Sequence, residues 1–128
     1  MDHILIAYDE PALCEVIVGM LDETGLQPVC VHSDRDAYAA LRDQGPFVGM
    51  ITDVNLGPGT TGFDVARAAR QMNPAIAVIY ASGEASPESF RMFGVPDSAF
   101  LSKPFRAGQL LQALEAQLAR HFRSSEQP

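Results

Sequence analysis

Apolar residues along the chain gather in short runs that have the length of β-strands. The runs cover residues 3–8, 28–32, 48–53, 76–80 and 99–102. Turn-forming or polar residues bound each of them, and runs with this length and these boundaries are typical of buried strands. The pattern therefore predicts five strands.

The segments between these runs carry apolar residues at helical spacing. The stripes are Leu13, Val16, Ile17, Met20 and Leu21; Ala37, Tyr38 and Leu41; Phe63, Val65, Ala66, Ala69 and Met72; and Leu110, Leu111, Leu114, Leu118 and Phe122. Gly25 is predicted to stop the first helix, Ser33 or Asp34 to cap the second, and Pro74 to follow the third. Another short helix is predicted after residues 86–88 and ends before Gly94.

Strands that alternate with helices predict a parallel sheet with helices on both faces. Because right-handed crossovers allow few arrangements, the expected fold class is α/β, a doubly wound five-stranded parallel sheet with five helices. The sequence contains no visible repeat, linker or second domain. We expect one domain over residues 1–123 and a frayed polar tail over residues 124–128.

Charge and the lack of a targeting segment narrow the function classes. The 128 residues have a formal net charge of −7, which argues against nucleic-acid or anionic-membrane partners, because both require a basic surface. No apolar run approaches the roughly 20 residues of a membrane span, and MDHILIAYDE lacks the features of a signal peptide. We therefore expect a cytoplasmic protein. Cys14 and Cys30 form no CxxC or zinc spacing and are interpreted as buried free thiols.

Polar residues follow the predicted strands at their carboxyl ends. Asp9 follows the first strand, Asp53 ends the third, Ser82 follows the fourth and Lys103 follows the fifth. In a doubly wound sheet these ends meet at one edge, where ligands bind. Two carboxylates there suit Mg²⁺, and one beside the ion can act as a nucleophile toward a phosphoryl group. The lysine and the hydroxyl could then bind the phosphoryl oxygens.

The same residues lie in four segments, ILIAYDEP, ITDVNL, VIYASGE and FLSKPF. In this order, over about residues 3–120, the segments resemble the receiver domain of two-component response regulators. The resemblance implies a flavodoxin-like topology with strand order 2-1-3-4-5. It also implies that the chain accepts a phosphoryl group from a histidine kinase or a histidine phosphotransfer protein, with Mg²⁺ as the cofactor. Such a protein is a switch and not an enzyme, since it catalyses only its own phosphorylation and dephosphorylation.

The role of each site residue follows from this resemblance. The site comprises the phosphoacceptor Asp53, the phosphoryl-binding residues Lys103 and Ser82, the switch residues Ser82 and Phe100, and the metal ligands Asp9, Asp53 and Asn55, the last through its backbone carbonyl. The resemblance also implies a cis peptide bond before Pro104. Taken alone, Phe100 would be interpreted as a core residue and Lys103 as a surface lysine.

The sequence departs from the usual receiver pattern at three places. Receivers carry two adjacent acids after the first strand, whereas Tyr8 here replaces the first of them, adds bulk near the pocket and removes one negative charge. We therefore expect weaker Mg²⁺ binding and slower phosphorylation by small donors. Glu10 and Glu84 are further modifiers of the pocket, although alternation along a strand turns Glu10 away from Asp9. The glycine-rich loop LGPGTTG is one residue longer than usual, and the fourth helix is short.

Three functions compete. The leading hypothesis is a stand-alone receiver that signals to an unidentified target through altered protein–protein contacts, or drains phosphoryl groups from a kinase. The alternative is a phosphorylation-independent receiver that acts as an interaction adaptor. It is considered because Tyr8 replaces one acidic residue of the pocket. A flavodoxin-like cofactor binder would need a phosphate-cradling loop after the first strand, but the residues there read YDEP and would repel phosphate.

Overall fold

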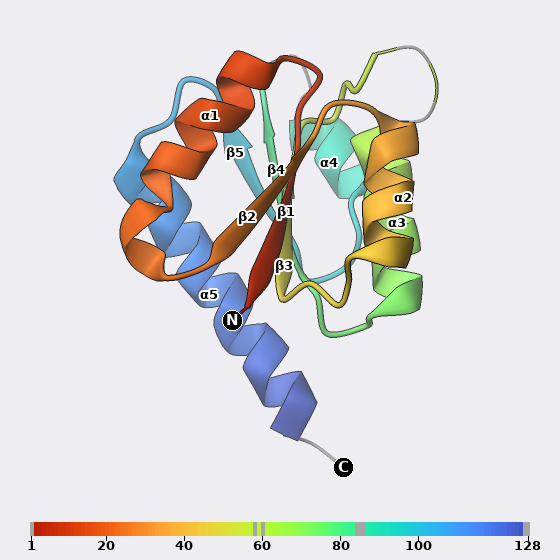
Figure 1. Cartoon of the computed structure of the whole chain (residues 1–128), viewed down its shortest axis with the longest axis vertical. Coiled ribbons are helices and arrows are strands. Elements are labelled where there is room, and N and C mark those ends of the chain that lie inside the picture. Colours follow the sequence, from red (N-terminus) through yellow and green to blue (C-terminus); the bar gives the residue numbers. More distant parts are fainter. Residues whose placement is uncertain (1, 58, 60, 84–86, 127–128) are drawn as a thin grey trace.

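The strands form one parallel sheet. They are β1 (His3–Ala7), β2 (Gln27–Val31), β3 (Gly49–Thr52), β4 (Ala77–Ser82) and β5 (Ala99–Ser102). In the computed structural model, which describes residues 2–57, 59, 61–83 and 87–126, they lie in the order β2-β1-β3-β4-β5 (Figure 1). All four neighbouring pairs are parallel. The predicted fold class and strand order are confirmed.

Helices cover both faces of the sheet. They are α1 (Pro11–Met20), α2 (Asp34–Asp43), α3 (Gly62–Met72), α4 (Pro87–Phe93) and α5 (Ala107–Glu126). Figure 1 shows α1 and α5 on one face and α2 and α3 on the other, with α4 on the side of α3. No helix in the described part of the chain is both long enough and apolar enough to cross a membrane.

Alternate strand residues build two hydrophobic layers. Ile4 and Ile6 of β1 pack toward α1 and α5, whereas Leu5 and Ala7 pack toward α2 and α3, and all four are fully buried. Every residue of β3 and β4 is buried as well. A strand that is covered on both faces appears in the sequence as a continuous apolar run, which explains why runs, and not alternation, predicted the strands.

Side chains satisfy the free backbone amides at two helix starts. The Ser33 hydroxyl accepts a hydrogen bond of 3.1 Å from the Asp36 amide, so Ser33, and not Asp34, caps α2. Thr61 and Asp64 form a reciprocal capping box at the start of α3. Both caps lie at the carboxyl edge of the sheet, where they fix the direction in which the chain leaves the strand ends.

Several predicted boundaries shift by a few residues. Helix α1 ends at Met20, and a 3₁₀ turn over Asp22–Thr24 separates it from Gly25, whose φ of 77° ends the turn. Strand β4 runs on to Ser82, two residues beyond the predicted end. Helix α5 continues to Glu126, so residues 124–126 of the expected tail are helical, while the domain limit at residue 123 stays a prediction.

Both cysteines are free thiols, as predicted. Cys14 of α1 is buried against the sheet, and Cys30 of β2 is half-buried in the same layer. The Cys14 thiol donates a hydrogen bond of 3.6 Å to the Ile6 carbonyl. Burial raises the pKa of this thiol to about 12. Cys14 therefore stays protonated and behaves as a small apolar core residue.

Candidate functional site

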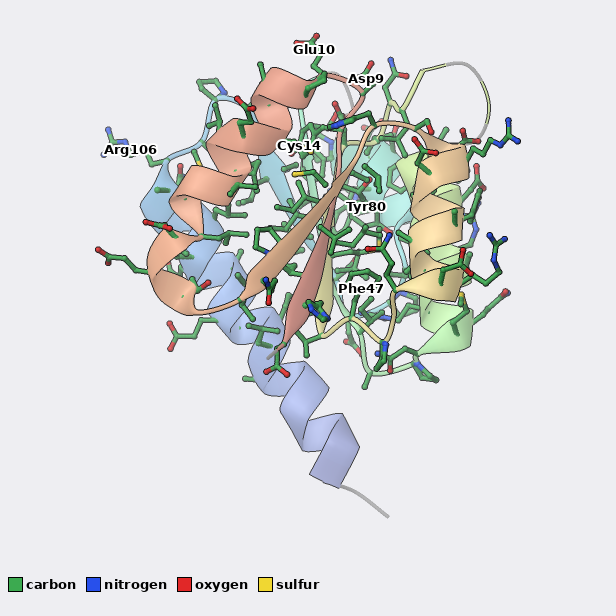
Figure 2. The ribbon with its side chains drawn as sticks, in the orientation of Figure 1. Asp9, Glu10, Cys14, Phe47, Tyr80 and Arg106 are labelled. Atoms are coloured by element: carbon green, nitrogen blue, oxygen red, sulfur yellow. The ribbon has the colours of Figure 1, made fainter. Side chains whose placement is uncertain are left out.

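The strand ends bring the predicted site residues to one edge of the sheet. Asp53 directly follows β3, and its amide donates a hydrogen bond of 2.9 Å to the Ala7 carbonyl at the end of β1. Ser82 is the last residue of β4, and Lys103 is the first residue after β5. Figure 2 shows Asp9 and Glu10 at this same end of the molecule, where the chain passes from β1 into α1.

An acidic pocket opens between these strand ends. It has a volume of about 210 Å³ and is lined by Asp9, Glu10, Leu13, Asp53, Asn55, Gly83 and Lys103. Glu10 therefore shares the pocket with Asp9, and the expected alternation fails because β1 ends at Ala7 and Glu10 already serves as the N-cap of α1. Glu84, another predicted modifier of the pocket, lies outside the described residues.

Asp53 is a nearly buried carboxylate with a cation beside it. Its side chain is 12% exposed, and the Lys103 side chain is 27% exposed. The Lys103 Nζ atom lies 3.7 Å from Asp53 Oδ2, and the Asn55 amide lies 3.4 Å from Oδ1. A buried carboxylate needs such partners, since desolvation penalises its charge. Asp53 and Lys103 both line the acidic pocket.

Tyr8 lies beside this pair, and its bulk is near the pocket without lining it. The ring is fully buried in the α1–α5 layer, and the phenol donates a hydrogen bond of 2.9 Å to the Ala81 carbonyl. The Lys103 Nζ atom lies 4.7 Å from the centroid of the ring. Burial, and then the negative charge of Asp53, raise the pKa of Tyr8 above its ordinary value. The phenol is therefore a neutral donor.

Ser82 and Phe100 lie on the far side of Asp53 from Tyr8. Ser82 is buried and lines a second cavity of about 470 Å³, between the loop after β3 and helices α3 and α4, which also reaches Asn55. Phe100 is half-buried and stacks on Phe90 of α4 with ring centroids 5.5 Å apart. The core residue Tyr80, labelled in Figure 2, also contacts Phe90, with the two rings edge to face and their centroids 5.7 Å apart. A row of rings thus connects β5 with α4.

The glycine-rich loop after Asp53 uses backbone conformations that other residues resist. Gly57 and Gly59 have φ angles of 87° and 122°, as the sequence indicated for this loop. The Asn55 side chain accepts a hydrogen bond of 3.1 Å from the Gly57 amide. The Lys103–Pro104 peptide bond is cis, as predicted.

The donor groups of the pocket fit a magnesium ion. Asp9 and Asp53 line the pocket with carboxylate groups, and Asn55 lines it as well. Carboxylate and carbonyl oxygens are the hard ligands that Mg²⁺ prefers together with water. Among the described residues, no group of three or more His, Cys, Asp or Glu side chains could enclose a metal. Mg²⁺ usually keeps several waters and binds through one or two carboxylates, a number that Asp9 and Asp53 together supply.

Replacing Tyr8 with phenylalanine is expected to make the free energy of unfolding fall less steeply as the pH rises into the alkaline range. An unfolded tyrosine ionises near pH 10, whereas folded Tyr8 keeps its proton to higher pH. The protonated Tyr8 phenol therefore contributes fully to the free energy of unfolding below about pH 10. This contribution is lost as the pH rises further, at up to about 1.4 kcal/mol per pH unit. Urea denaturation at several pH values above about 9 measures both slopes, and parallel profiles for wild type and Tyr8→Phe would contradict the expectation.

Comparisons with known proteins agree with this geometry. The family model of the response regulator receiver domain matches residues 4–115. The response regulator receiver protein CpdR of Brucella abortus is 28% identical over 119 residues, which are 92% of this chain and 98% of that protein. A crystal structure of a response regulator receiver protein from Sinorhizobium medicae is 33% identical, with a TM-score of 0.88 over 94% of this chain and 96% of that one. A CheY-like receiver domain protein from Methanospirillum hungatei, at 21% identity, shares the fold with a TM-score of 0.84, over 97% and 98% of the two chains.

Proposed function

The chain belongs to the response regulator receiver domain family, and we propose that it is a switch whose Asp53 accepts a phosphoryl group. The donor is a phosphohistidine of a histidine kinase or of a histidine phosphotransfer protein. One observation carries the proposal: Asp53 is a nearly buried carboxylate that is paired with Lys103 and lines an acidic pocket at the carboxyl edge of the sheet. A signalling switch of this family acts on itself and is not an enzyme with a separate substrate.

The carboxylate supplies the nucleophile for this transfer. An oxygen of Asp53 forms a bond to phosphorus, the phosphorus–nitrogen bond of the phosphohistidine breaks, and its electron pair returns to the imidazole. Lys103, 3.7 Å from Oδ2, lies where it can bind an oxygen of the arriving phosphoryl group. The Asn55 amide lies near the other carboxylate oxygen and helps to hold its orientation. Catalysis of this kind depends on positioning and charge stabilisation.

Asp9, Asp53 and the Asn55 carbonyl would hold the magnesium ion that this family uses. When bound, the ion neutralises negative charge that develops on the phosphoryl oxygens. Among the described residues that line the pocket, Glu10 is the one further acid, and the pocket's lysine offsets part of the negative charge. Since Tyr8 is neutral, we expect weaker magnesium binding than an additional acid at position 8 would give.

The signal is expected to leave through β4, β5 and α4. Ser82 moves toward the phosphoryl group, and the space that it leaves lets Phe100 shift against Phe90 of α4. Met92 and Phe93 of this helix are 74% and 49% exposed, which makes its outer face suited to binding a protein partner. The net charge of −7 argues against a nucleic-acid or membrane target, and we place the protein in the cytoplasm with its phosphoryl donors.

Direct phosphorylation tests the proposal. The wild-type protein is incubated with a small phosphoryl donor such as acetyl phosphate, with and without Mg²⁺, and its intact mass is measured. We expect one added phosphoryl group in the presence of Mg²⁺, and reduction with borohydride should trap the acyl phosphate at Asp53. Failure of both the small donor and a phosphorylated kinase to label the protein would favour the phosphorylation-independent adaptor.

A further inference from the structure

We propose that Tyr8 is a positioning residue that holds the Lys103 ammonium group beside Asp53 through the face of its ring. The inference rests on the proposed function for its effect on phosphoryl transfer, while the contact itself can be tested without any phosphoryl donor. Tyr8 stands where receivers usually carry the first of two adjacent acids, and the structure shows where its side chain lies. The ring lies under the lysine and outside the acidic pocket.

The first step of the argument is that the Tyr8 ring is rigidly anchored. The Tyr8 amide donates a hydrogen bond of 3.1 Å to the Val31 carbonyl, and the Tyr8 carbonyl accepts one of 3.1 Å from His32 Nδ1. At the far end of the side chain, the phenol donates to the Ala81 carbonyl of β4 at 2.9 Å. The residue is 0% exposed. Tyr8 is thus fixed at both ends between the carboxyl ends of β2 and β4.

The second step is that Lys103 needs such a support. A lysine carries its charge on a flexible four-carbon stem and binds as a point charge, so its ammonium group must be held in place by what surrounds it. Asp53 contributes on one side, but its Oδ2 atom is 3.7 Å away, which is longer than a normal hydrogen bond. The Tyr8 ring, with its centroid 4.7 Å from Nζ, contributes on another side. A cation over an aromatic face is attracted by the ring quadrupole.

The third step concerns why a neutral ring serves here. An acid in this place would also attract Lys103, but it would neutralise the ammonium group and compete with Asp53 for it. The ring holds the cation without cancelling its charge, so the charge remains available to phosphoryl oxygens. The Lys103 amide also donates to the Ser82 carbonyl at 3.3 Å. Tyr8 and Lys103 are therefore both attached to the last two residues of β4, where the proposed switch begins.

The experiment uses the fact that Lys103 is the only lysine of the 128 residues. Protein made with ¹³C,¹⁵N-lysine has a single set of lysine side-chain NMR signals, recorded without metal or phosphoryl donor. In wild type we expect the ε-CH₂ protons upfield of their position in a free lysine, because they lie over the Tyr8 ring, with cross-relaxation to the ring protons. Tyr8→Phe, which keeps the ring and loses the phenol, should retain the upfield shift. Tyr8→Leu, which stays apolar but loses the ring, should abolish it.

Phosphorylation rates of the same variants test the consequence. Because Tyr8→Leu loses the cation–π contact, we expect its rate of Asp53 phosphorylation by acetyl phosphate to fall about fivefold. Tyr8→Phe, which keeps the ring, should retain most of the wild-type rate. Equal losses in both variants would overturn the proposal, because the phenol and not the ring would then matter. A free-lysine shift in wild type would overturn it as well, even if Tyr8→Leu fails to fold. If wild type is never phosphorylated, the proposed function fails while the lysine spectrum still decides the positioning role.

Discussion

An Asp53→Asn variant is expected to carry no phosphoryl group under conditions that label the wild-type protein completely. The substitution keeps the size of the side chain and its place beside Lys103, but it replaces a carboxylate oxygen by an amide that cannot form an acyl phosphate. The loss should therefore be complete, whereas a change in a positioning residue only slows the reaction. Intact-mass measurement after incubation with acetyl phosphate and Mg²⁺ reports the result directly.

Asp22→Asn is the matched control for this loss. Asp22 is exposed and begins the 3₁₀ turn after α1, at the opposite end of this helix from the pocket residue Glu10, and its replacement changes the net charge by the same amount. It should be labelled as fast as wild type. If Asp53→Asn were still labelled, the acceptor would be another acid, and Asp9 and Glu10 of the same pocket would be the first positions to map.

The residues of the site could be predicted because their placement follows from topology. Asp53 and Lys103 are 50 positions apart, yet each follows a run that is long enough for only one strand. Parallel strands bring their carboxyl ends to one edge, and the strand order that the receiver resemblance implied places β3 and β5 close enough there for the two side chains to meet. The 3.7 Å separation of Nζ and Oδ2 is the result. Burial on both faces also made the strands visible, because it requires uninterrupted apolar runs.

The direction of side chains just beyond a strand could not be predicted in the same way. Side chains were assumed to continue alternating between the two faces beyond the end of β1, and Glu10 was therefore predicted to point away from Asp9. In the structure both residues line the pocket. Tyr8 was expected to add bulk near the pocket, and its ring is buried in the layer beneath α1 and α5, against the pocket residue Lys103. Once the ladder ends, the capping geometry of the next helix sets these directions. Nothing in the spacing indicates the contact between Tyr8 and Lys103, since it depends on the order of the strands in the sheet.

The row of rings beside the switch was missed for a related reason. Phe100 was assigned from resemblance alone, and Phe90 and Tyr80 were not connected with it. Strand register places Phe100 opposite Tyr80, and the short helix α4 lays Phe90 against both rings. An apolar run predicts a strand but does not fix its register relative to the neighbouring strand.

A Gly62→Ala variant is expected to lose about 3 kcal/mol of unfolding free energy, at the upper end of what overpacking costs. A β-carbon on Gly62 would overlap the Asp53 carbonyl oxygen and lie 2.9 Å from Thr52 Oγ1. The Asp53 carbonyl is backbone at the end of the central strand β3, so it cannot rotate away as a long side chain would. The Gly62 amide also donates to the Val54 carbonyl at 2.7 Å, which fixes the helix start against this loop. Urea denaturation at neutral pH measures the loss.

Gly108→Ala separates this clash from the general effect of adding a methyl group to the first turn of a helix. Gly108 is the second residue of α5, and a β-carbon there would meet nothing within 4 Å. The control should be neutral or gain up to about 1 kcal/mol, because alanine restricts the unfolded chain and favours a helix. Equal urea midpoints for the two variants would mean that the loop after Asp53 yields to the new methyl group. In that case the displacement of Asp53 should slow the phosphorylation of Gly62→Ala although the protein stays stable. The two variants therefore distinguish a role of Gly62 in fold stability from a role in the geometry of the acceptor.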